Sequence, residues 1–387
     1  MYDGPEMPPP LLIRAQRAIT PDETLEPAAV LVAGGIIEAV GTALNPPEGA
    51  QIVDLPGLTL VPGFVDLHVH GGGGFSLATS DPAEIVAYSA WVPRCGVTSF
   101  LAGIVARTPS SADVAIRAAI TAASPGAELL GLNLEGPFVN PARRGALPSG
   151  WLAEPDEALL DGLLAAADGR VRLVTVAPEL PGALDIMRAV VRAGVRASVG
   201  HTDASYDEAR AGFQAGASHL THVFNGMRPF HHRDPGPAGA ALDSEGVIIE
   251  VIADGVHLHP ATVRMLLGAF GPERVALITD GVAPAGLGEG AFQLGGQEAR
   301  LEAGRVTLPD GTIAGSAATV DAIVSNVVSW GAATLSDAVR MASTVPAIVA
   351  GAGSRKGRIV AGFDADIVAL AADLRVEAVW TRGVPAL

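Results

Sequence analysis

The 387-residue sequence predicts an α/β fold, a (β/α)₈ TIM-type barrel, from three observations. Short apolar runs alternate with helical patterns along the chain, several runs close on a histidine or an acidic residue, and eight such runs can be counted. Strands that alternate with helices form parallel sheets, and a barrel of this kind carries its chemistry at the carboxyl ends of its strands. We therefore expect the polar residues that close the runs to meet at one mouth of the barrel.

The expected elements follow one another through the middle of the chain. Strands are predicted near residues 61–68, 97–104, 128–134, 171–177, 195–200, 218–223, 247–252 and 274–279. Helical periodicity is found between them at residues 82–94, 110–123, 182–193, 204–215 and 260–269. Eight strands are the number that a closed (β/α)₈ barrel requires.

The first of these strands ends in His68-Val69-His70. Side chains two residues apart on a strand point the same way, so both imidazoles can bind one divalent cation. The glycines at 71–74 allow a sharp turn and leave such a cation open to a substrate. A strand end with two histidines facing water is an equally good interpretation of this motif alone, and the rest of the chain has to decide.

Further strand ends repeat the pattern. All nine histidines lie between His68 and His259, which indicates a central catalytic body with a flanking module. Three more histidines follow strand-like runs, and two carboxylates close others: His201, His222, His257, Glu135 and Asp280. Imidazole and carboxylate groups are the ligands that zinc and related cations use, and a carboxylate can also transfer protons.

Composition narrows the classes of function. Hydrophobic residues make up 49% of the chain and charged residues 17%, which indicates one large globular enzyme. The net charge of -16 argues against a nucleic-acid partner. No apolar stretch has the length of a membrane span and no signal pattern is found, so we expect no membrane partner and a cytoplasmic location. The single cysteine, Cys95, excludes a disulfide framework and is interpreted as a buried packing residue.

Lysine is almost absent, since Lys356 is the only one in the chain. The barrel therefore has no lysine that could be carboxylated to bridge two metals, and a side-chain carboxylate must take that place. Glu135 is the best placed, because a glutamate can span two cations or hold one. The same absence argues against Schiff-base chemistry and against a phosphate-binding P-loop.

These residues resemble the amidohydrolase superfamily and, within it, the N-acetylglucosamine-6-phosphate deacetylases. The resemblance covers nearly the whole chain and rests on the order of short motifs at residues 62–72, 134–138, 177–179, 200–202, 221–227, 253–257, 279–281 and 315–316. Residues 357–368 look like the superfamily's return into a small β-sandwich built with residues near 10 to 60. The expected domains are thus a composite β-sandwich from 1–60 and 355–387 and a barrel from 61–354.

The resemblance implies a role for each site residue. Glu135, His201 and His222 would hold one divalent metal ion, and His68 and His70, sharing Glu135, would complete a second site. The ion, one or two per chain, would be zinc, iron, manganese or cobalt.

Asp280 would be the general base, which takes a proton from the attacking water and returns it to the leaving amine. His257 would contact the sugar or the developing oxyanion, and Asn225 and Gly226 would meet the phosphate. Arg233 matches an arginine that reaches the phosphate from the neighbouring subunit, which implies a homodimer; a solvated loop arginine is the alternative.

The implied reaction is metal-dependent hydrolysis of N-acetylglucosamine 6-phosphate to glucosamine 6-phosphate and acetate. One position departs from the family, because Leu147 stands where a histidine is usual. An amidohydrolase acting on another acylated amino-sugar phosphate or acylamino compound is therefore the alternative. A non-catalytic assembly protein is a third hypothesis, against which the complete ligand set and the base argue. His219, His231, His232 and His259 are predicted to be surface or packing residues rather than ligands.

Overall fold

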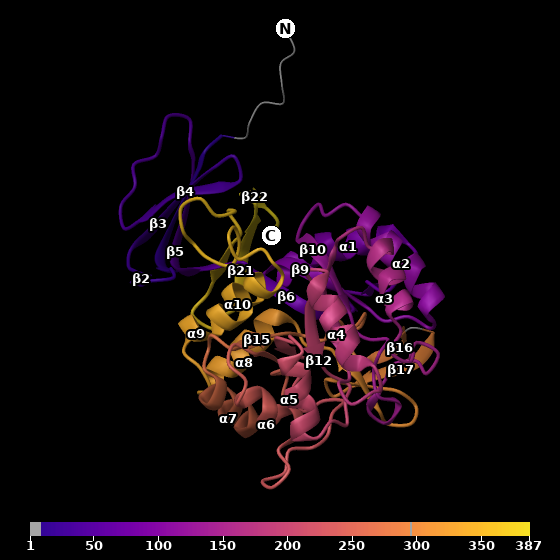
Figure 1. The fold of residues 1–387 in the computed structure, drawn as a ribbon. Helices are drawn as coiled ribbons and strands as arrows, with labels where there is room; N and C mark the ends of the chain where they lie inside the picture. The colour runs from indigo at the N-terminus through magenta and orange to yellow at the C-terminus, as the bar shows by residue number, and fades with distance from the viewer. Residues whose placement is uncertain (1–8, 295) are drawn as a thin grey trace.

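The computed structural model describes residues 9–294 and 296–387, so the first eight residues of the expected 1–60 segment lie outside it. Within this part, eight parallel strands form a nearly closed barrel, which confirms the predicted fold (Figure 1). In sheet order the strands are β15 (Val275–Leu277), β14 (Ile248–Val251), β13 (His219–Leu220), β12 (Arg196–Val199), β11 (Val171–Val176), β10 (Glu128–Leu134), β9 (Val97–Ile104) and β6 (Phe64–Val69).

Strand lengths follow the backbone conformation at the strand ends. β9 and β10 have the predicted bounds, whereas β13 and β15 are shorter than predicted. His222 lies two residues beyond β13 with a φ of 26°, and Asp280 lies three beyond β15 with a φ of 49°. A left-handed residue cannot continue a strand, so these strands stop early and the chain turns into the barrel mouth.

The first and last strands of the barrel, β6 and β15, are joined at the carboxyl end of the barrel, and we call this junction the seam. The backbone N–H of His70 donates to Gly281 O at 2.7 Å, and that of Asp280 donates to His68 O at 2.8 Å. Deeper in the seam, the Thr279 hydroxyl donates to the buried Asp66 carboxylate at 2.5 Å. Burial raises the pKa of Asp66 to about 6, and the hydrogen bonds from Thr279 oppose that rise. The seam thereby places Asp280 beside the His68-Val69-His70 motif.

Helices cover the outside of the barrel and begin at strong capping residues. Asp81 caps the first helix, Thr108 and Ser111 form a capping box at the second, and Ser205 and Glu208 form another at the fifth. The structure also contains helices that the sequence did not predict, among them the third, sixth and eighth. The bounds are α1 (Pro82–Trp91), α2 (Pro109–Thr121), α3 (Glu157–Ala166), α4 (Ala183–Arg192), α5 (Tyr206–Gln214), α6 (Gly236–Leu242), α7 (Pro260–Phe270), α8 (Val320–Ser329), α9 (Leu335–Val339) and α10 (Val345–Val349).

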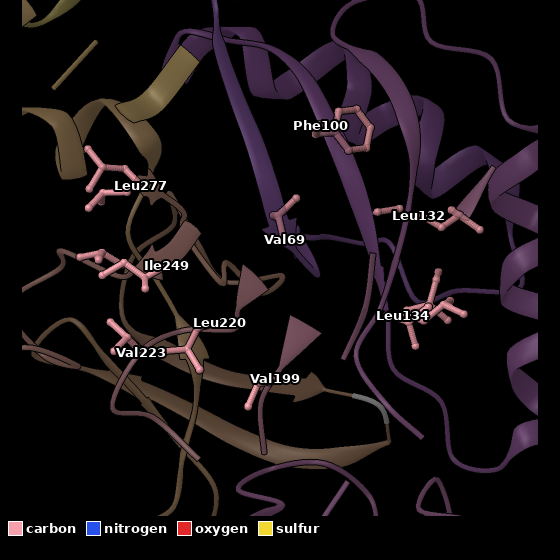
Figure 2. Packing of buried hydrophobic residues seen from close by; sticks show 14 of the residues in the cluster. Val69, Phe100, Leu132, Leu134, Val199, Leu220, Val223, Ile249 and Leu277 are labelled. Carbon is pink, nitrogen blue, oxygen red and sulfur yellow. The ribbon is translucent and has the colours of Figure 1, made fainter. Parts of the chain in front are cut away.

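The hydrophobic core follows the strands around the barrel. Figure 2 labels buried side chains from every barrel strand except β11: Val69, Phe100, Leu132, Leu134, Val199, Leu220, Ile249 and Leu277. All eight residues of β9 are buried, which explains why the strand appears in the sequence as a continuous apolar run. This packing makes the barrel a rigid support for the side chains at its mouth.

A separate sheet is built from both chain ends, as predicted, and Figure 1 shows its indigo and yellow strands together beside the barrel. Its strands are β1 (Leu11–Ile19), β2 (Thr24–Leu25), β3 (Ala28–Ala33), β4 (Ile36–Gly41), β5 (Gln51–Pro62), β20 (Ile367–Leu370), β21 (Val376–Thr381) and β22 (Val384–Pro385). Residues from both ends of the chain, including Ile13, Val30, Ile367 and Trp380, form a core of their own. β20 pairs with the end of β5, so the C-terminal segment returns to the strand that leads into the barrel.

A second, four-stranded antiparallel sheet follows Asp280 and precedes α8. It comprises β16 (Gly290–Leu294), β17 (Gln297–Glu302), β18 (Arg305–Thr307) and β19 (Ile313–Ser316), and the sequence did not predict it. A short hairpin of β7 (Gly71–Gly72) and β8 (Phe75–Ser76) follows the His68-Val69-His70 motif. None of the helices in the described part of the chain combines the length and apolar character that a bilayer crossing requires.

The only lysine is buried where the sheet domain meets the barrel. Lys356 is 1% exposed, and its Nζ contacts carboxylate oxygens of Asp366 at 2.5 Å, Asp364 at 2.9 Å and Glu128 at 3.0 Å. Glu128 begins barrel strand β10, whereas the two aspartates lie just before β20 of the sheet domain. The ammonium therefore links the two domains electrostatically.

Replacing this lysine tests how much the junction contributes to stability. We expect Lys356→Met to lower the free energy of unfolding by about 3–5 kcal/mol, because it leaves the buried Asp366 carboxylate without its cation, whereas Asp364 and Glu128 keep Arg355. Urea denaturation followed by circular dichroism measures the change. Arg375→Met is the matched control, since Arg375 pairs with Glu377 on the surface and is 70% exposed. A loss no larger than that of the control would show that the junction does not depend on this charge.

Candidate metal centre and active site

A cavity of about 250 Å³ opens at the carboxyl ends of the barrel strands. Eight of the predicted site residues line it: His70, Glu135, His201, His222, Asn225, Gly226, His257 and Asp280. His68 is not among the lining residues and is fully buried, and its Nε2 lies 3.5 Å from Glu135 Oε1. Arg233 is the one predicted residue that the structure does not place here.

Glu135 lies between four histidines, and we call these five residues the ligand group: Glu135, His68, His70, His201 and His222. Its Oε1 is 2.8 Å from His201 Nε2, 3.0 Å from His222 Nε2 and 3.5 Å from His68 Nε2. Its Oε2 is 3.1 Å from His70 Nε2. The residues form two groups that could each hold a metal ion, His68–His70–Glu135 and Glu135–His201–His222, with Glu135 in both. Glu135 is thus common to both groups, and its role as a bridge between two cations stays a prediction.

All four imidazoles present the same nitrogen to this centre. The Nδ1 atoms face acceptors in the surrounding protein: Gly103 O for His70, Arg143 O for His201, Asn225 O for His222 and the Glu250 carboxylate for His68. Carbonyl and carboxylate oxygens only accept, so each Nδ1 carries a hydrogen and each Nε2 faces the centre. His68 Nε2 is buried without a hydrogen-bond partner. Four converging nitrogens and one carboxylate fit a divalent cation.

The electrostatics of this group favour positive charge. Burial raises the pKa of Glu135, but the charge of His68 and hydrogen bonds from His201 and His222 outweigh it and hold the pKa well below its usual range. Burial lowers the pKa of His70, yet hydrogen bonds to Asp280 and Glu135 raise it to about 9. The centre therefore attracts cationic charge, which a proton or a metal ion can supply.

Asp280 stands beside the ligand group on the far side of the seam. Its Oδ1 is 3.3 Å from His70 Nε2 and 3.8 Å from His68 Nε2. Burial raises the pKa of Asp280, but the hydrogen bond from His70 and the charge of His68 lower it further, so the net pKa lies below its usual value. The carboxylate is thus ionised at neutral pH and able to accept a proton.

Three site residues have a strained backbone. His201, His222 and Asp280 have φ values of 45°, 26° and 49°. Histidine and aspartate tolerate left-handed conformations better than branched residues do, but each still costs on the order of 1–3 kcal/mol. In each case the turn directs a side chain from a strand end into the barrel mouth, which places the strain at the ligand group.

The remaining cavity residues have defined supports. Asp254 Oδ2 accepts a hydrogen bond from His257 Nδ1 at 2.7 Å. Burial lowers the pKa of His257, but this aspartate raises it above its usual value. Asn225 holds its amide against the carbonyls of His222 and Val223. Gly226 has a φ of 53°, and a Cβ there would lie 2.8 Å from His201 Nδ1, so only glycine fits at this position.

Arg233 lies outside the cavity, on an exposed turn between His231 and Asp234. Its Nη1 contacts His232 Nε2 at 2.8 Å. None of the described residues that line the cavity is an arginine or a lysine. A phosphate in this cavity would therefore meet no arginine or lysine side chain of the same described chain.

Apolar residues make up one wall of the cavity. Leu147 lines it together with Leu294, Leu308 and Ile313. The last three belong to the four-stranded sheet or its connections, and Gln297 Nε2 of that sheet contacts Ala146 O at 3.4 Å. Leu147 therefore lies where the loop after Glu135 meets the four-stranded sheet of β16 to β19.

The other histidines differ from one another. His231 and His232 are exposed, as surface residues should be, and the His259 ring caps α7 by accepting from the Ala261 N–H. His219 is fully buried, and its Nε2 contacts Glu250 Oε1 at 3.1 Å. Sequence reasoning missed Glu250 altogether, although a lone charge inside the apolar run 247–252 was the signal that could have indicated it.

Comparisons with known proteins cover the whole fold. Residues 59–385 match the Amidohydrolase family. The chain is 35% identical over 375 residues to the N-acetylgalactosamine-6-phosphate deacetylase of Escherichia coli O157:H7, covering 96% of this chain and 98% of that protein. It is 34% identical over 380 residues to the N-acetylglucosamine-6-phosphate deacetylase of Bacillus subtilis (strain 168), covering 96% of each.

A solved structure is similar over the same extent. It is a mutant N-acetyl-D-glucosamine-6-phosphate deacetylase from Mycobacterium smegmatis in complex with N-acetyl-D-glucosamine-6-phosphate, with a TM-score of 0.92 at 36% identity. The match covers 98% of this chain and 100% of that chain. The likeness thus includes the sheet domain as well as the barrel.

Proposed function

The chain belongs to the amidohydrolase family, and we propose that it hydrolyses the acetyl amide of N-acetylglucosamine 6-phosphate to glucosamine 6-phosphate and acetate. The resemblance seen in the sequence is confirmed, and the chain is a hydrolase by its relatives. The observation that carries the proposal is the convergence of Glu135, four histidines and Asp280 in one cavity. This convergence also argues against a non-catalytic assembly protein.

The ligand group is proposed to hold one or two divalent cations, zinc, iron, manganese or cobalt, on Glu135 and the inward Nε2 atoms. A bound cation would lower the pKa of a water molecule and polarise the carbonyl of the amide. The side chains around it would fix the substrate's position and the direction of proton transfer.

Asp280 is proposed to move the proton. Its ionised carboxylate takes a proton from the water as the water oxygen attacks the carbonyl carbon, and gives it to the amine nitrogen as the C–N bond breaks. His257, held by Asp254, is proposed to donate a hydrogen bond to the sugar or to the developing oxyanion. Asn225 and the backbone of Gly226 are proposed to contact the phosphate.

Arg233 is proposed to complete the phosphate site from the second subunit of a homodimer. The absence of an arginine or lysine among the described cavity residues supports this assignment, because a guanidinium suits bidentate contact with a dianionic phosphate. We expect Arg233→Ala to raise KM for the phosphorylated substrate about tenfold or more while changing KM for N-acetylglucosamine little. Steady-state kinetics on both sugars measure the difference, and equal effects on both would contradict the assignment.

Two controls separate this role from a general loss of fold. Arg192→Ala removes another exposed arginine, on α4, and should leave both KM values unchanged. Mixed dimers of Arg233→Ala and Asp280→Asn chains should regain part of the wild-type activity, because one site of each would combine an intact Asp280 with an intact Arg233. No recovery in mixed dimers would place Arg233 in the site of its own chain.

N-acetylgalactosamine 6-phosphate is the second candidate substrate. The relative from Escherichia coli carries that name at 35% identity, against 34% for the N-acetylglucosamine-6-phosphate relative from Bacillus subtilis. The two sugars differ only in the configuration of the hydroxyl on C4. Leu147 and the apolar wall around it cannot form a hydrogen bond with that hydroxyl, so this wall does not select between the epimers through polar contacts.

Acetate release tests the proposal. Purified protein, with its metals counted by elemental analysis, is given N-acetylglucosamine 6-phosphate, its C4 epimer and unphosphorylated N-acetylglucosamine. We expect the first to be hydrolysed with the highest kcat/KM, and a chelator to abolish activity that an added divalent cation restores. Higher kcat/KM on the epimer would transfer the assignment to it. No release from any of the three, with metal bound, would contradict the sugar-phosphate assignment.

A further inference from the structure

A buried carboxylate outside the ligand group connects its two halves. Glu250 lies on β14 and is fully buried. Its Oε2 is 2.9 Å from His68 Nδ1 and accepts the backbone N–H of His222 at 3.0 Å. His68 belongs to one metal-binding group and His222 to the other. One carboxylate oxygen thus contacts a member of each group.

The contact with His68 differs in kind from those of the other ligands. His70, His201 and His222 each direct Nδ1 at a neutral backbone carbonyl. His68 alone among these four directs it at an anionic carboxylate. A carboxylate behind an imidazole fixes the tautomer and the ring orientation, and it makes the opposite nitrogen a stronger ligand.

The contact does not arise from neighbouring strands. β14 pairs with β13 and β15, whereas β6, which carries His68, pairs with β9. The two residues are 182 positions apart, and the hydrogen bond crosses the barrel interior rather than following a strand ladder. The pairing of Glu250 Oε1 with His219 on the adjacent strand would suffice for packing. The second oxygen is thus left to orient the ligand group.

We propose that Glu250 is a positioning residue that holds the His68 ring for cation binding and couples the two metal-binding groups through the backbone of His222. This rests on the proposed metal dependence. Removing the charge of Glu250 should weaken the group that contains His68 more than the group that contains His201. A variant without the Glu250 charge should therefore lose cation affinity first, and lose turnover only as a consequence of the lost cation.

Glu250→Gln tests the role without changing shape. The amide oxygen can still accept from His68 Nδ1 and from the His222 N–H, and the amide nitrogen can donate to His219. Metal-stripped wild type and variant are titrated with Co²⁺, whose visible spectrum reports its coordination, and bound metal is counted by elemental analysis. His68→Gln identifies which cation depends on His68. We expect Glu250→Gln to weaken that cation's binding about 10–100-fold and to change the other less than threefold.

A double variant distinguishes positioning from a general loss of structure. If Glu250 acts through His68, Glu250→Gln should add nothing to His68→Gln. Thr175→Val is the matched control, because it removes a buried hydroxyl that contacts Thr221 inside the same barrel and should leave both affinities unchanged. Additive losses, an equal loss in the control, or wild-type affinity in Glu250→Gln would each overturn the inference. A wild-type protein that binds no cation would instead overturn the proposed metal dependence, and this inference with it.

Discussion

Asp280→Asn is expected to lower kcat for N-acetylglucosamine 6-phosphate by about a thousandfold, with the cation content nearly unchanged. The amide cannot accept the proton of the attacking water, so the proton path to the leaving amine is lost. The asparagine side chain has nearly the size of the aspartate, and the backbone N–H of residue 280 still donates to His68 O. The barrel seam should therefore stay intact. Stopped assays of acetate release together with elemental analysis measure both quantities.

The matched control for this variant is Asp113→Asn, which makes the same substitution in a surface ion pair with Arg117. It should leave kcat, KM and metal content at wild-type values. Wild-type turnover in Asp280→Asn would disprove the proposed proton transfer. Loss of turnover accompanied by loss of metal would instead assign Asp280 to cation binding, since its Oδ1 lies 3.3 Å from His70 Nε2.

Glu135→Gln is expected to have the second large effect, the loss of cation binding in both groups. The carboxylate is shared by the two groups, and no other described acidic residue belongs to either of them. At a free cation concentration one hundred times the wild-type Kd, cation binding stabilises the wild-type fold by about 2.7 kcal/mol. If the variant binds the cation a hundredfold more weakly, the same concentration stabilises it by only about 0.4 kcal/mol. Thermal unfolding with and without added cation measures this difference, and activity should be lost in parallel.

Stability in the absence of cation serves as the control for Glu135→Gln. The amide removes part of the counter-charge of His70, whose pKa the carboxylate helps to raise to about 9, so some loss of unfolding temperature is expected without cation. A variant that keeps the full cation-dependent stabilisation would show that the ions bind elsewhere. The expected pattern is therefore specific: added cation raises the unfolding temperature of the variant little, whatever the variant loses without cation.

The barrel was predictable because its signals are local. Runs such as β9 and β10 are buried on both faces, so an apolar stretch of the right length indicates a strand directly. The His68-Val69-His70 motif was informative for the same reason, since period-two geometry needs no knowledge of the rest of the fold. Carboxylates and histidines at strand ends then had to meet, because parallel strands end at the same edge.

Features that depend on distant contacts could not be predicted. Helix α6 consists mainly of small buried residues, so its sequence shows no amphipathic pattern. Strand β16 of the four-stranded sheet alternates exposed and part-buried residues within a Gly-rich stretch. Glu250 reaches His68 across 182 positions, and no local pattern specifies such a contact. The candidate site residues that follow strand ends could be named from the sequence. Glu250, which contacts His68 from the barrel interior, could not.

The burial of Lys356 also determines how the protein responds to chemical modification. Acylating reagents and amine-directed crosslinkers find no accessible lysine on the described fold, because the one lysine is 1% exposed among three carboxylates. Modification of that amine requires the junction between sheet domain and barrel to open. A mass shift at this single position would thus record how often the two domains separate, and attachment through lysine would select the opened molecules.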